Sequence, residues 1–314
     1  MSAESEIFDR ILSNVSRVIV GKDEVIKKIV CCWISGGHVL LEDVPGTGKT
    51  VLARALAKST NCEFNRVQFT PDLLPSDILG ASVFNQKERS FDFHPGPIFT
   101  TIFLGDEINR ATPRTQSALL EAMAERQVTI DGETRRIDAQ FFALATQNPV
   151  DQLGTFQLPE AQLDRFYMKL SIGYPTPEQE VQIAKNQNER HPIHDISPVE
   201  SKERIAWLAD QVSKVKISEE VYSYIMDFVN LTRNCEQLKV GASPRTTLAL
   251  AKVSQAMACV EGMDYVVPNH VFSVLNEVVG HRLILTAEAR LAGWSSKDVI
   301  EHLKTLVRVP VQAA

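Results

Sequence analysis

Residues 43–50 read Asp-Val-Pro-Gly-Thr-Gly-Lys-Thr, a pattern suited to binding phosphate. Gly46 and Gly48 let backbone amides turn toward an anion, because neither carries a Cβ atom. Lys49 would supply a positive charge to the β- and γ-phosphates of a nucleotide, and Thr50 would offer a hydroxyl to Mg²⁺. The helix expected after the loop aims its positive end at the same anion. The expected nucleotide-binding residues of this loop are Val44, Pro45, Gly46, Thr47, Gly48, Lys49, Thr50 and Val51.

Asp43 occupies the position where the P-loop pattern G-x-x-x-x-G-K-[ST] has its first glycine. Aspartate tolerates a left-handed backbone better than most residues, so we still expect the turn to form. Its negative charge near the phosphates would weaken nucleotide affinity, and Asp43→Gly should then tighten binding. The alternative is a glycine turn that only caps a helix, but a strand before it and a helix after it favour phosphate binding.

Asp106 and Glu107 follow a second apolar run, Thr101 to Leu104. Asp106 would hold Mg²⁺ and Glu107 would polarise the attacking water. A solvated acidic turn is the alternative, since Asp-Glu pairs are common. Their position at the end of a buried strand downstream of a P-loop favours the catalytic interpretation.

Three further residues have two interpretations each. Asn148 ends a third apolar run and would either orient the same water or simply begin a turn before Pro149. Arg165 would either form a surface ion pair or reach the γ-phosphate of a neighbouring subunit. Arg245 follows Ser243-Pro244 in the first turn of a helix, where the dipole disfavours a cation, so a bound phosphate or a structural carboxylate should lie nearby.

Short apolar strands interleaved with helical patterns predict a mainly parallel sheet covered on both faces, over residues 1–175. Gly173-Tyr174-Pro175-Thr176-Pro177 predicts a domain boundary, after which residues 176–314 read as helices. Two hairpins are expected at about residues 82–93 and 127–138, the second around Asp131-Gly132. The predicted fold is therefore a three-layer αβα P-loop domain followed by a smaller all-α domain.

The composition is that of an ordinary globular protein, with 314 residues, 44% hydrophobic and 23% charged. A net charge of -6 argues against a bulk basic surface for nucleic acid. Five cysteines without a C-x-x-C pair indicate reduced thiols. The chain shows no run long enough to span a membrane and no apolar signal segment, so we expect a cytoplasmic protein.

Together these residues resemble the AAA+ ATPases, and most closely the MoxR family. The resemblance covers nearly the whole chain, and the run Leu158 to Phe166 (LPEAQLDRF) is its most specific part. Other carriers are Val20-Gly21-Lys22, Val44 to Thr50, Phe93 to Ile98, Asp106 to Arg110, Ala145 to Pro149 and Gly241 to Arg245.

The resemblance implies roles for these positions. Lys49 and Thr50 would be Walker A, Asp106 and Glu107 Walker B, and Asn148 sensor 1. Arg165 would be the arginine finger acting in trans and Arg245 sensor 2 acting in cis. Val20 and Gly21 would border the adenine. A ring, usually a hexamer, would place nucleotide at each subunit interface.

The leading functional prediction is an Mg-ATP hydrolase that remodels a protein client. MoxR-like proteins are regarded as chaperone-like and often work with a von Willebrand factor A domain partner in metal insertion or enzyme maturation. Two rivals remain, a nucleotide-gated scaffold with little turnover and a DNA-dependent motor. The acids around Arg135 and Arg136 in the second hairpin, and the net charge, argue against the motor.

Overall fold

The computed structural model describes residues 2–149, 155–186 and 191–310. Its strands are β1 (Val39–Glu42), β2 (Phe64–Gln68), β3 (Gly80–Asn85), β4 (Ser90–Pro95), β5 (Ile102–Asp106), β6 (Gln127–Ile130), β7 (Glu133–Arg136), β8 (Phe142–Gln147), β9 (Met168–Leu170), β10 (Leu238–Val240) and β11 (Ile284–Leu285). Its helices are α1 (Ala3–Ser16), α2 (Asp23–Ile34), α3 (Lys49–Ser59), α4 (Pro75–Leu79), α5 (Pro113–Glu125), α6 (Glu160–Leu163), α7 (Pro177–Asn186), α8 (Lys202–Lys214), α9 (Glu219–Arg233), α10 (Pro244–Val260), α11 (Pro268–Phe272), α12 (Leu275–Val279), α13 (Ala287–Leu291) and α14 (Ser296–Leu306), with the 3-10 helices η1 (Ile108–Arg110), η2 (Pro192–His194) and η3 (Gly280–Arg282).

The central sheet has five strands in the order β2-β5-β8-β1-β9, and every neighbouring pair is parallel. The three predicted apolar strands form its middle. Because all strands run the same way, their carboxyl ends lie along one edge of the sheet, where ligands of such folds bind. This edge therefore brings together the loops that follow β1, β5 and β8.

The sheet is buried on both faces, as a parallel sheet requires. In β1, Leu40 belongs to one hydrophobic cluster while Val39 and Leu41 belong to the other. One cluster contains the inward faces of α1, α2 and α3, and the other contains that of α5. The predicted three-layer αβα arrangement is thus confirmed.

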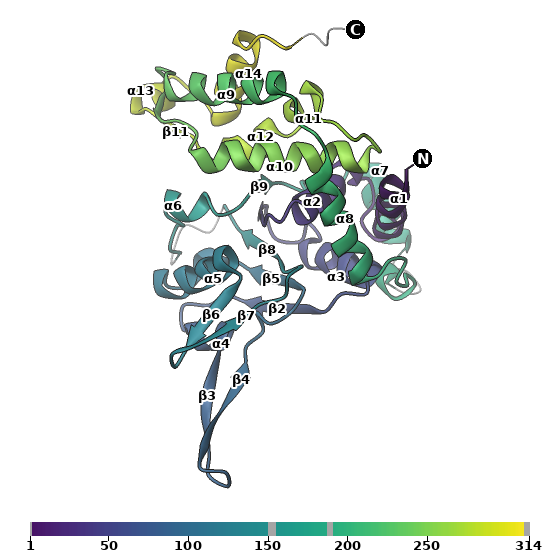
Figure 1. Cartoon of the computed structure of the whole chain (residues 1–314), viewed down its shortest axis with the longest axis vertical. Coiled ribbons are helices and arrows are strands. Elements are labelled where there is room, and N and C mark those ends of the chain that lie inside the picture. Colours follow the sequence, from purple (N-terminus) through teal and green to yellow (C-terminus); the bar gives the residue numbers. More distant parts are fainter. Residues whose placement is uncertain (1, 150–154, 187–190, 311–314) are drawn as a thin grey trace.

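Helices α9 to α14 form a lid at one end of the molecule, as Figure 1 shows. Helix α9 is continuous over 15 residues, whereas the chain from Pro268 to Arg282 is divided into α11, α12 and η3 before the short strand β11. Strands β10 and β11 form a small antiparallel pair, so the lid is helical with one two-stranded addition. The boundary at residue 175, between β9 and α7, stays a prediction.

Two hairpins leave the sheet between its strands. In the first, β3 pairs with β4 and projects from the end of the molecule opposite the lid (Figure 1). In the second, β6 pairs with β7 around Asp131 and Gly132, whose φ angles of 53° and 81° suit a tight hairpin turn. In the segments that the structure describes, no helix has the length and apolarity needed to cross a bilayer.

Candidate functional site

The loop between β1 and α3 has the backbone that the sequence predicts around its glycines. Gly46 and Gly48 both have φ of 87°, a left-handed conformation that side chains with a Cβ rarely adopt. Gly48 is the N-cap of α3, so Lys49 and Thr50 form the first turn of that helix. The amino end of α3 therefore opens toward the carboxyl edge of the sheet, as an anion site would require.

Lys49 reaches back across the loop. Its ammonium group donates to the carbonyl oxygens of Asp43 at 2.7 Å and Val44 at 3.0 Å. Partial burial lowers the pKa of Lys49 below its ordinary value, while the carboxylates of Asp43, Asp106 and Glu107 act in the opposite direction. The negative charges of these three acids therefore favour the charged form of Lys49 and offset part of the effect of burial on its pKa.

Asp43 has neither the left-handed backbone nor the phosphate-facing carboxylate that we expected. Its φ is not positive, and its carboxylate, in a residue 5% exposed, is turned to the strand beside the loop. It accepts hydrogen bonds from Ser171 Oγ at 2.6 Å, from the Ile172 amide at 2.7 Å and from the Gly173 amide at 3.0 Å. The Asp43 side chain thus connects the loop to the chain after β9 by hydrogen bonds, which a glycine could not form. The expected repulsion of phosphates, and tighter binding by Asp43→Gly, no longer follow.

Asp106 lies at the end of β5 and is 8% exposed. Its Oδ1 accepts from Thr146 Oγ1 at 2.6 Å, and its Oδ2 accepts from Arg66 Nη2 at 2.7 Å and Nε at 3.2 Å. Thr146 also accepts from the Glu107 amide at 2.9 Å, so one hydroxyl orients both acidic residues. Hydrogen bonds to both oxygens therefore fix the orientation of the Asp106 carboxylate.

Glu107 has φ of 58°, a left-handed conformation that costs of order 1–3 kcal/mol in a residue other than glycine. Such strain is concentrated at functional sites. Its carboxylate accepts from Gln68 Nε2 at 2.9 Å and from Arg110 Nη1 at 2.9 Å. The strained backbone aims the side chain at β2 and η1 instead of along β5.

These groups line one cavity of about 390 Å³. Asn148, 6% exposed, borders it from the end of β8. Four of the expected nucleotide-binding residues do not line this cavity: Val20, Gly21, Val44 and Thr47. Gly21 instead lies against α7, because a Cβ atom at this position would be 1.9 Å from the Gln179 side chain. The lining is Pro45, Gly46, Gly48, Lys49, Thr50, Val51, Arg66, Gln68, Asp106, Glu107 and Asn148.

The donor set in this cavity suits Mg²⁺ held partly by a nucleotide. Thr50 and Asp106 offer only oxygen ligands, which Mg²⁺ prefers. Within the described residues, no group of three His, Cys, Asp or Glu side chains could hold a metal unaided. Mg²⁺ commonly binds through one or two protein oxygens together with substrate phosphates, so the two residues fit this role.

Arg165 and Arg245 lie in a different cavity, of about 290 Å³, between the sheet domain and the lid. Arg165 Nη1 donates to the carbonyl of Leu120 at 2.7 Å. Arg245 stands 4.0 Å from the carboxylate of Asp164, so the nearby structural acid considered as an alternative is present. Among the described residues that line the P-loop cavity, Arg245 is absent. This geometry does not support the expected cis role.

Asp164 connects this second cavity to the lid. Its carboxylate accepts from Arg282 Nε at 2.8 Å and from Ser243 Oγ at 3.2 Å. Arg282, with a side chain 3% exposed, also donates to the Phe166 carbonyl at 2.8 Å. Burial lowers the pKa of Arg282, and Asp164 opposes that effect. The buried ion pair fixes the start of α10, and with it Arg245, beside Arg165.

The sequence analysis did not identify Arg66, Gln68 or Thr146. Arg66 and Gln68 lie on β2, a strand whose mixed polar and half-buried residues have no clear apolar pattern. Thr146 is fully buried in β8, two residues before Asn148. Thr146 lies within the run Ala145 to Pro149 that supports the family resemblance, but its residue type did not indicate that it contacts both acids.

Comparisons with known proteins agree with this architecture. The profile of the ATPase family associated with various cellular activities (AAA) matches residues 38–168, and that of the AAA lid domain matches residues 230–303. A crystal structure of a proposed ATPase from Cytophaga hutchinsonii is similar, with a TM-score of 0.90 and 38% identity, over 98% of this chain and 96% of that one. Fold, loop and lid together define an AAA+ ATPase.

Three relatives indicate the family within the AAA+ ATPases to which the chain is most similar. The chain is 44% identical to the uncharacterized protein YeaC of Bacillus subtilis, over 98% of this chain and 96% of that protein. It is 37% identical to the chaperone MoxR1 of Mycobacterium tuberculosis, over 99% and 84%, and 31% identical to the protein MoxR of Paracoccus denitrificans, over 86% of each. The chain belongs to the MoxR family of AAA+ ATPases.

Proposed function

We propose that this chain hydrolyses Mg-ATP and uses the energy to remodel a protein client. The observation that supports this most directly is the single cavity shared by Lys49, Thr50, Asp106, Glu107 and Asn148. Lys49 and the amino end of α3 would bind the β- and γ-phosphates. Thr50 and Asp106 would hold Mg²⁺, which neutralises charge on the phosphates when bound. Val20 and Gly21 would border the adenine from outside this cavity.

Glu107 and Asn148 would position the attacking water. Glu107 accepts from Gln68 and Arg110 through Oε2 alone, so Oε1 would be the oxygen that accepts from the water. Asn148 borders the same cavity from the neighbouring strand. Positioning and charge neutralisation supply most of the catalysis in phosphoryl transfer, so these fixed side chains suit the reaction.

The test is phosphate release at saturating ATP. Glu107→Gln should keep nucleotide binding and lower the rate by about 100-fold or more, as expected for loss of a general base. Lys49→Ala should lose most binding in a fluorescent-nucleotide titration. The matched change Glu121→Gln, an exposed acid of α5, should alter neither. Wild-type release at the background rate would instead favour the nucleotide-gated scaffold.

We propose that Arg165 and Arg245 both serve a neighbouring subunit's nucleotide. They line a cavity of their own, separate from the P-loop cavity of the same chain. An arginine that stabilises transition-state charge must reach the γ-phosphate, and a second copy of the chain can supply that phosphate. This requires a ring of identical subunits, and the family resemblance favours a hexamer.

The client would contact the β3–β4 hairpin. Phe84 and Phe91 face each other across this hairpin with ring centroids 5.3 Å apart, yet they are 51% and 71% exposed. Val83 is 52% exposed beside them. Aromatic side chains exposed on a projecting hairpin suit binding to apolar segments of a partly folded protein. A von Willebrand factor A domain partner, metal insertion or enzyme maturation, and a cytoplasmic location remain proposals from the resemblance and the sequence.

Arg135 argues against the DNA-dependent motor. Its guanidinium pairs with Glu133 at 2.5 Å and lies 4.0 Å from the centroid of the Phe93 ring. These contacts engage the residue within the protein, so it is poorly placed to neutralise a phosphate backbone. We expect DNA to leave the rate of phosphate release unchanged.

A further inference from the structure

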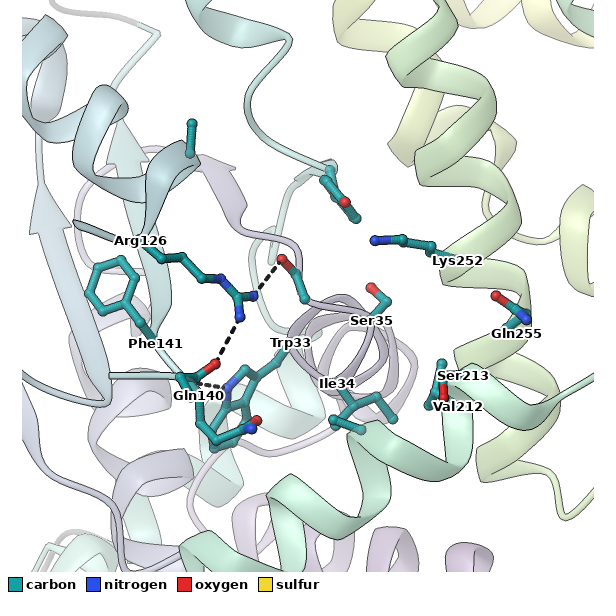
Figure 2. A pocket seen from close by; sticks show the side chains of 15 residues that line it. Trp33, Ile34, Ser35, Arg126, Gln140, Phe141, Val212, Ser213, Lys252 and Gln255 are labelled. Carbon is teal, nitrogen blue, oxygen red and sulfur yellow. Dashed lines mark hydrogen bonds between the residues drawn. The ribbon is translucent and has the colours of Figure 1, made fainter. Parts of the chain in front are cut away.

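A cavity of about 560 Å³ lies between the sheet domain and the lid (Figure 2). The carboxyl end of α2, Arg126 and Tyr167 form one wall, and α8 together with the lid helix α10 forms the opposite wall. It shares no lining residue with the P-loop cavity. Its volume is in the range of sites for small organic ligands.

The charge of this cavity is opposite to that of the chain. The chain has a net charge of -6, but the cavity lining contains two cations, Arg126 and Lys252, and no carboxylate. The other polar groups of the wall are neutral and include Ser35, Ser213 and Gln255. The lining therefore favours an anion.

Hydrogen bonds hold the Arg126 guanidinium in place and leave some of its N–H donors available to a ligand. It donates to the carbonyls of Ala139 at 2.8 Å and Gly36 at 3.2 Å, which uses two of the five N–H donors of a guanidinium. These bonds join two chain segments of the sheet domain and give Arg126 a structural role. The remaining donors have no carboxylate in ion-pair contact among the residues that the structure describes.

Lys252 has no comparable structural role. Within the described chain its ammonium group has no hydrogen-bond or ion-pair partner. In Figure 2 it extends from α10 into the cavity, while Arg126 enters from the other side. An anion between them would accept hydrogen bonds from both domains, and such charge-assisted bonds are about twice as strong as neutral ones.

Part of the remaining lining is apolar or aromatic. Trp33 stacks on Phe142 with centroids 5.6 Å apart, and its indole N–H donates to the Gln140 carbonyl at 2.9 Å. Ile34 and Phe141 belong to the same wall as Trp33, and Val212 of α8 belongs to the opposite wall. A ligand here would place its charged group at the two cations and an apolar body along these side chains.

We propose that this cavity is a second ligand site, which binds a small organic anion with an apolar or aromatic body. Its phosphate or carboxylate group lies between Arg126 and Lys252 and links the sheet domain to the lid. The site has no lining residue in common with the P-loop cavity, so the proposal does not depend on the function assigned to the P-loop. It adjoins the cavity of Arg165 and Arg245, which Arg126 also lines.

The test uses the full chain with Lys49→Ala, which disables the P-loop site, in titration calorimetry. The probes are phenyl phosphate and benzoate, which carry the two acid groups on the same ring, and inorganic phosphate, which has no apolar body. We expect saturable binding of at least one aromatic anion, more tightly than inorganic phosphate. Adding Lys252→Ala should weaken it about tenfold, as for the loss of one charged hydrogen bond. The control Lys297→Ala, an exposed lysine at the start of α14, should not.

The tighter of the two aromatic probes identifies the acid group of the ligand. Absence of saturable binding up to about 10 mM for both aromatic probes would overturn the proposal. So would equal affinity in the Lys252→Ala and Lys297→Ala proteins, or inorganic phosphate that binds as tightly as phenyl phosphate. A Lys252→Glu protein should bind neither aromatic probe, because a carboxylate would then face the ligand's own charge.

Discussion

Asp43 holds the start of the phosphate loop through three hydrogen bonds to residues 171–173. Asp43→Gly removes all three and leaves the Ile172 amide without its buried partner. We expect the free energy of unfolding to fall by about 2–4 kcal/mol and nucleotide binding to weaken, because the loop loses its anchor. Urea unfolding and a nucleotide titration measure the two effects. Tighter binding at unchanged stability would instead restore the role of Asp43 as a repulsive charge.

Arg66 donates to Oδ2 of Asp106, the carboxylate proposed to hold Mg²⁺. Its side chain is 45% exposed, so it could leave Asp106 at low cost, and it would have to yield or share Oδ2 if Mg²⁺ bound to that oxygen. We expect Arg66→Gln to lower the Mg²⁺ concentration for half-maximal nucleotide binding about fivefold, the effect of one partly screened charge. The matched change Arg54→Gln, on the exposed side of α3, should have little effect. A higher Mg²⁺ requirement would mean that Arg66 holds Asp106 in its binding orientation.

At the scale of elements, the sequence predicted the centre of the sheet but not its edges. The strands β1, β5 and β8 are buried on both faces and therefore appear as apolar runs. Edge strand β2 is only half buried, and β9 has three residues, so neither leaves a clear pattern. The contacts of Asp106 with Arg66 and of Glu107 with Gln68 were missed for that reason. Asp106 and Glu107 could be predicted from the sequence of their own strand, whereas Arg66 and Gln68 lie on a neighbouring strand whose pairing the sequence does not show.

The domain arrangement was the part of the site least accessible to the sequence. Arg165 and Arg245 each had two interpretations, and the choice depended on what faces them. The lid position is set by contacts distant in sequence, such as Arg282 with Asp164 and the packing of α10 on α2. Such contacts leave no local periodicity. The separate cavity of the two arginines therefore appears only in the folded chain.

The β3–β4 hairpin gives a prediction at this scale. Phe84→Ser with Phe91→Ser removes the exposed aromatic pair while the β3–β4 backbone pairing remains. We expect basal ATP hydrolysis to persist, but the stimulation of hydrolysis by a partly folded protein such as reduced, carboxymethylated lactalbumin to disappear. A matched pair on the other hairpin, Thr129→Ala with Thr134→Ala, removes a cross-strand hydroxyl contact and should preserve stimulation. Equal stimulation in both double variants would exclude the β3–β4 hairpin as the client contact.

For the whole molecule, His38 predicts a loss of stability in acid. It is 4% exposed, it accepts from the Ala143 amide at Nδ1, and burial lowers its pKa from 6.5 to about 4. Because the unfolded chain takes up this proton near pH 6.5 and the folded chain does not, the stabilisation is present above pH 6.5. It decreases as the pH falls toward 4.

At pH 5 the loss from His38 alone is about 2 kcal/mol relative to pH 7. Urea unfolding at both values measures it. His38→Gln retains a donor and an acceptor of similar reach but cannot titrate, so its stability should change less between the two pH values by that amount. Other titrating groups contribute equally to both proteins, so the same pH dependence in both would show that the pKa of His38 is not lowered in the fold.

Ring assembly gives the prediction that tests the two arginines. If the proposed roles hold, a Glu107→Gln subunit lacks its own water-positioning carboxylate but still presents Arg165 and Arg245 to its neighbour. Arg165→Ala and Arg245→Ala subunits have the reverse defect, because each keeps an intact P-loop cavity. Each single variant should bind ATP nearly as wild type does and release phosphate at close to the background rate.

Mixing Glu107→Gln subunits with either arginine variant should restore activity, because some interfaces then pair an intact Glu107 with intact arginines. Restored activity should rise with total protein concentration, since assembly does.

Mixing Arg165→Ala with Arg245→Ala tests whether the two arginines act together. Each subunit then presents only one of the two arginines, so no interface contains both, and mixing should restore nothing. Differential tags must first show that mixed oligomers form. If mixed oligomers form and Glu107→Gln with Arg245→Ala stays inactive while Glu107→Gln with Arg165→Ala recovers, then Arg165 alone acts in trans. The lid would then have to move Arg245 out of its cavity beside Asp164 and toward the P-loop of its own chain.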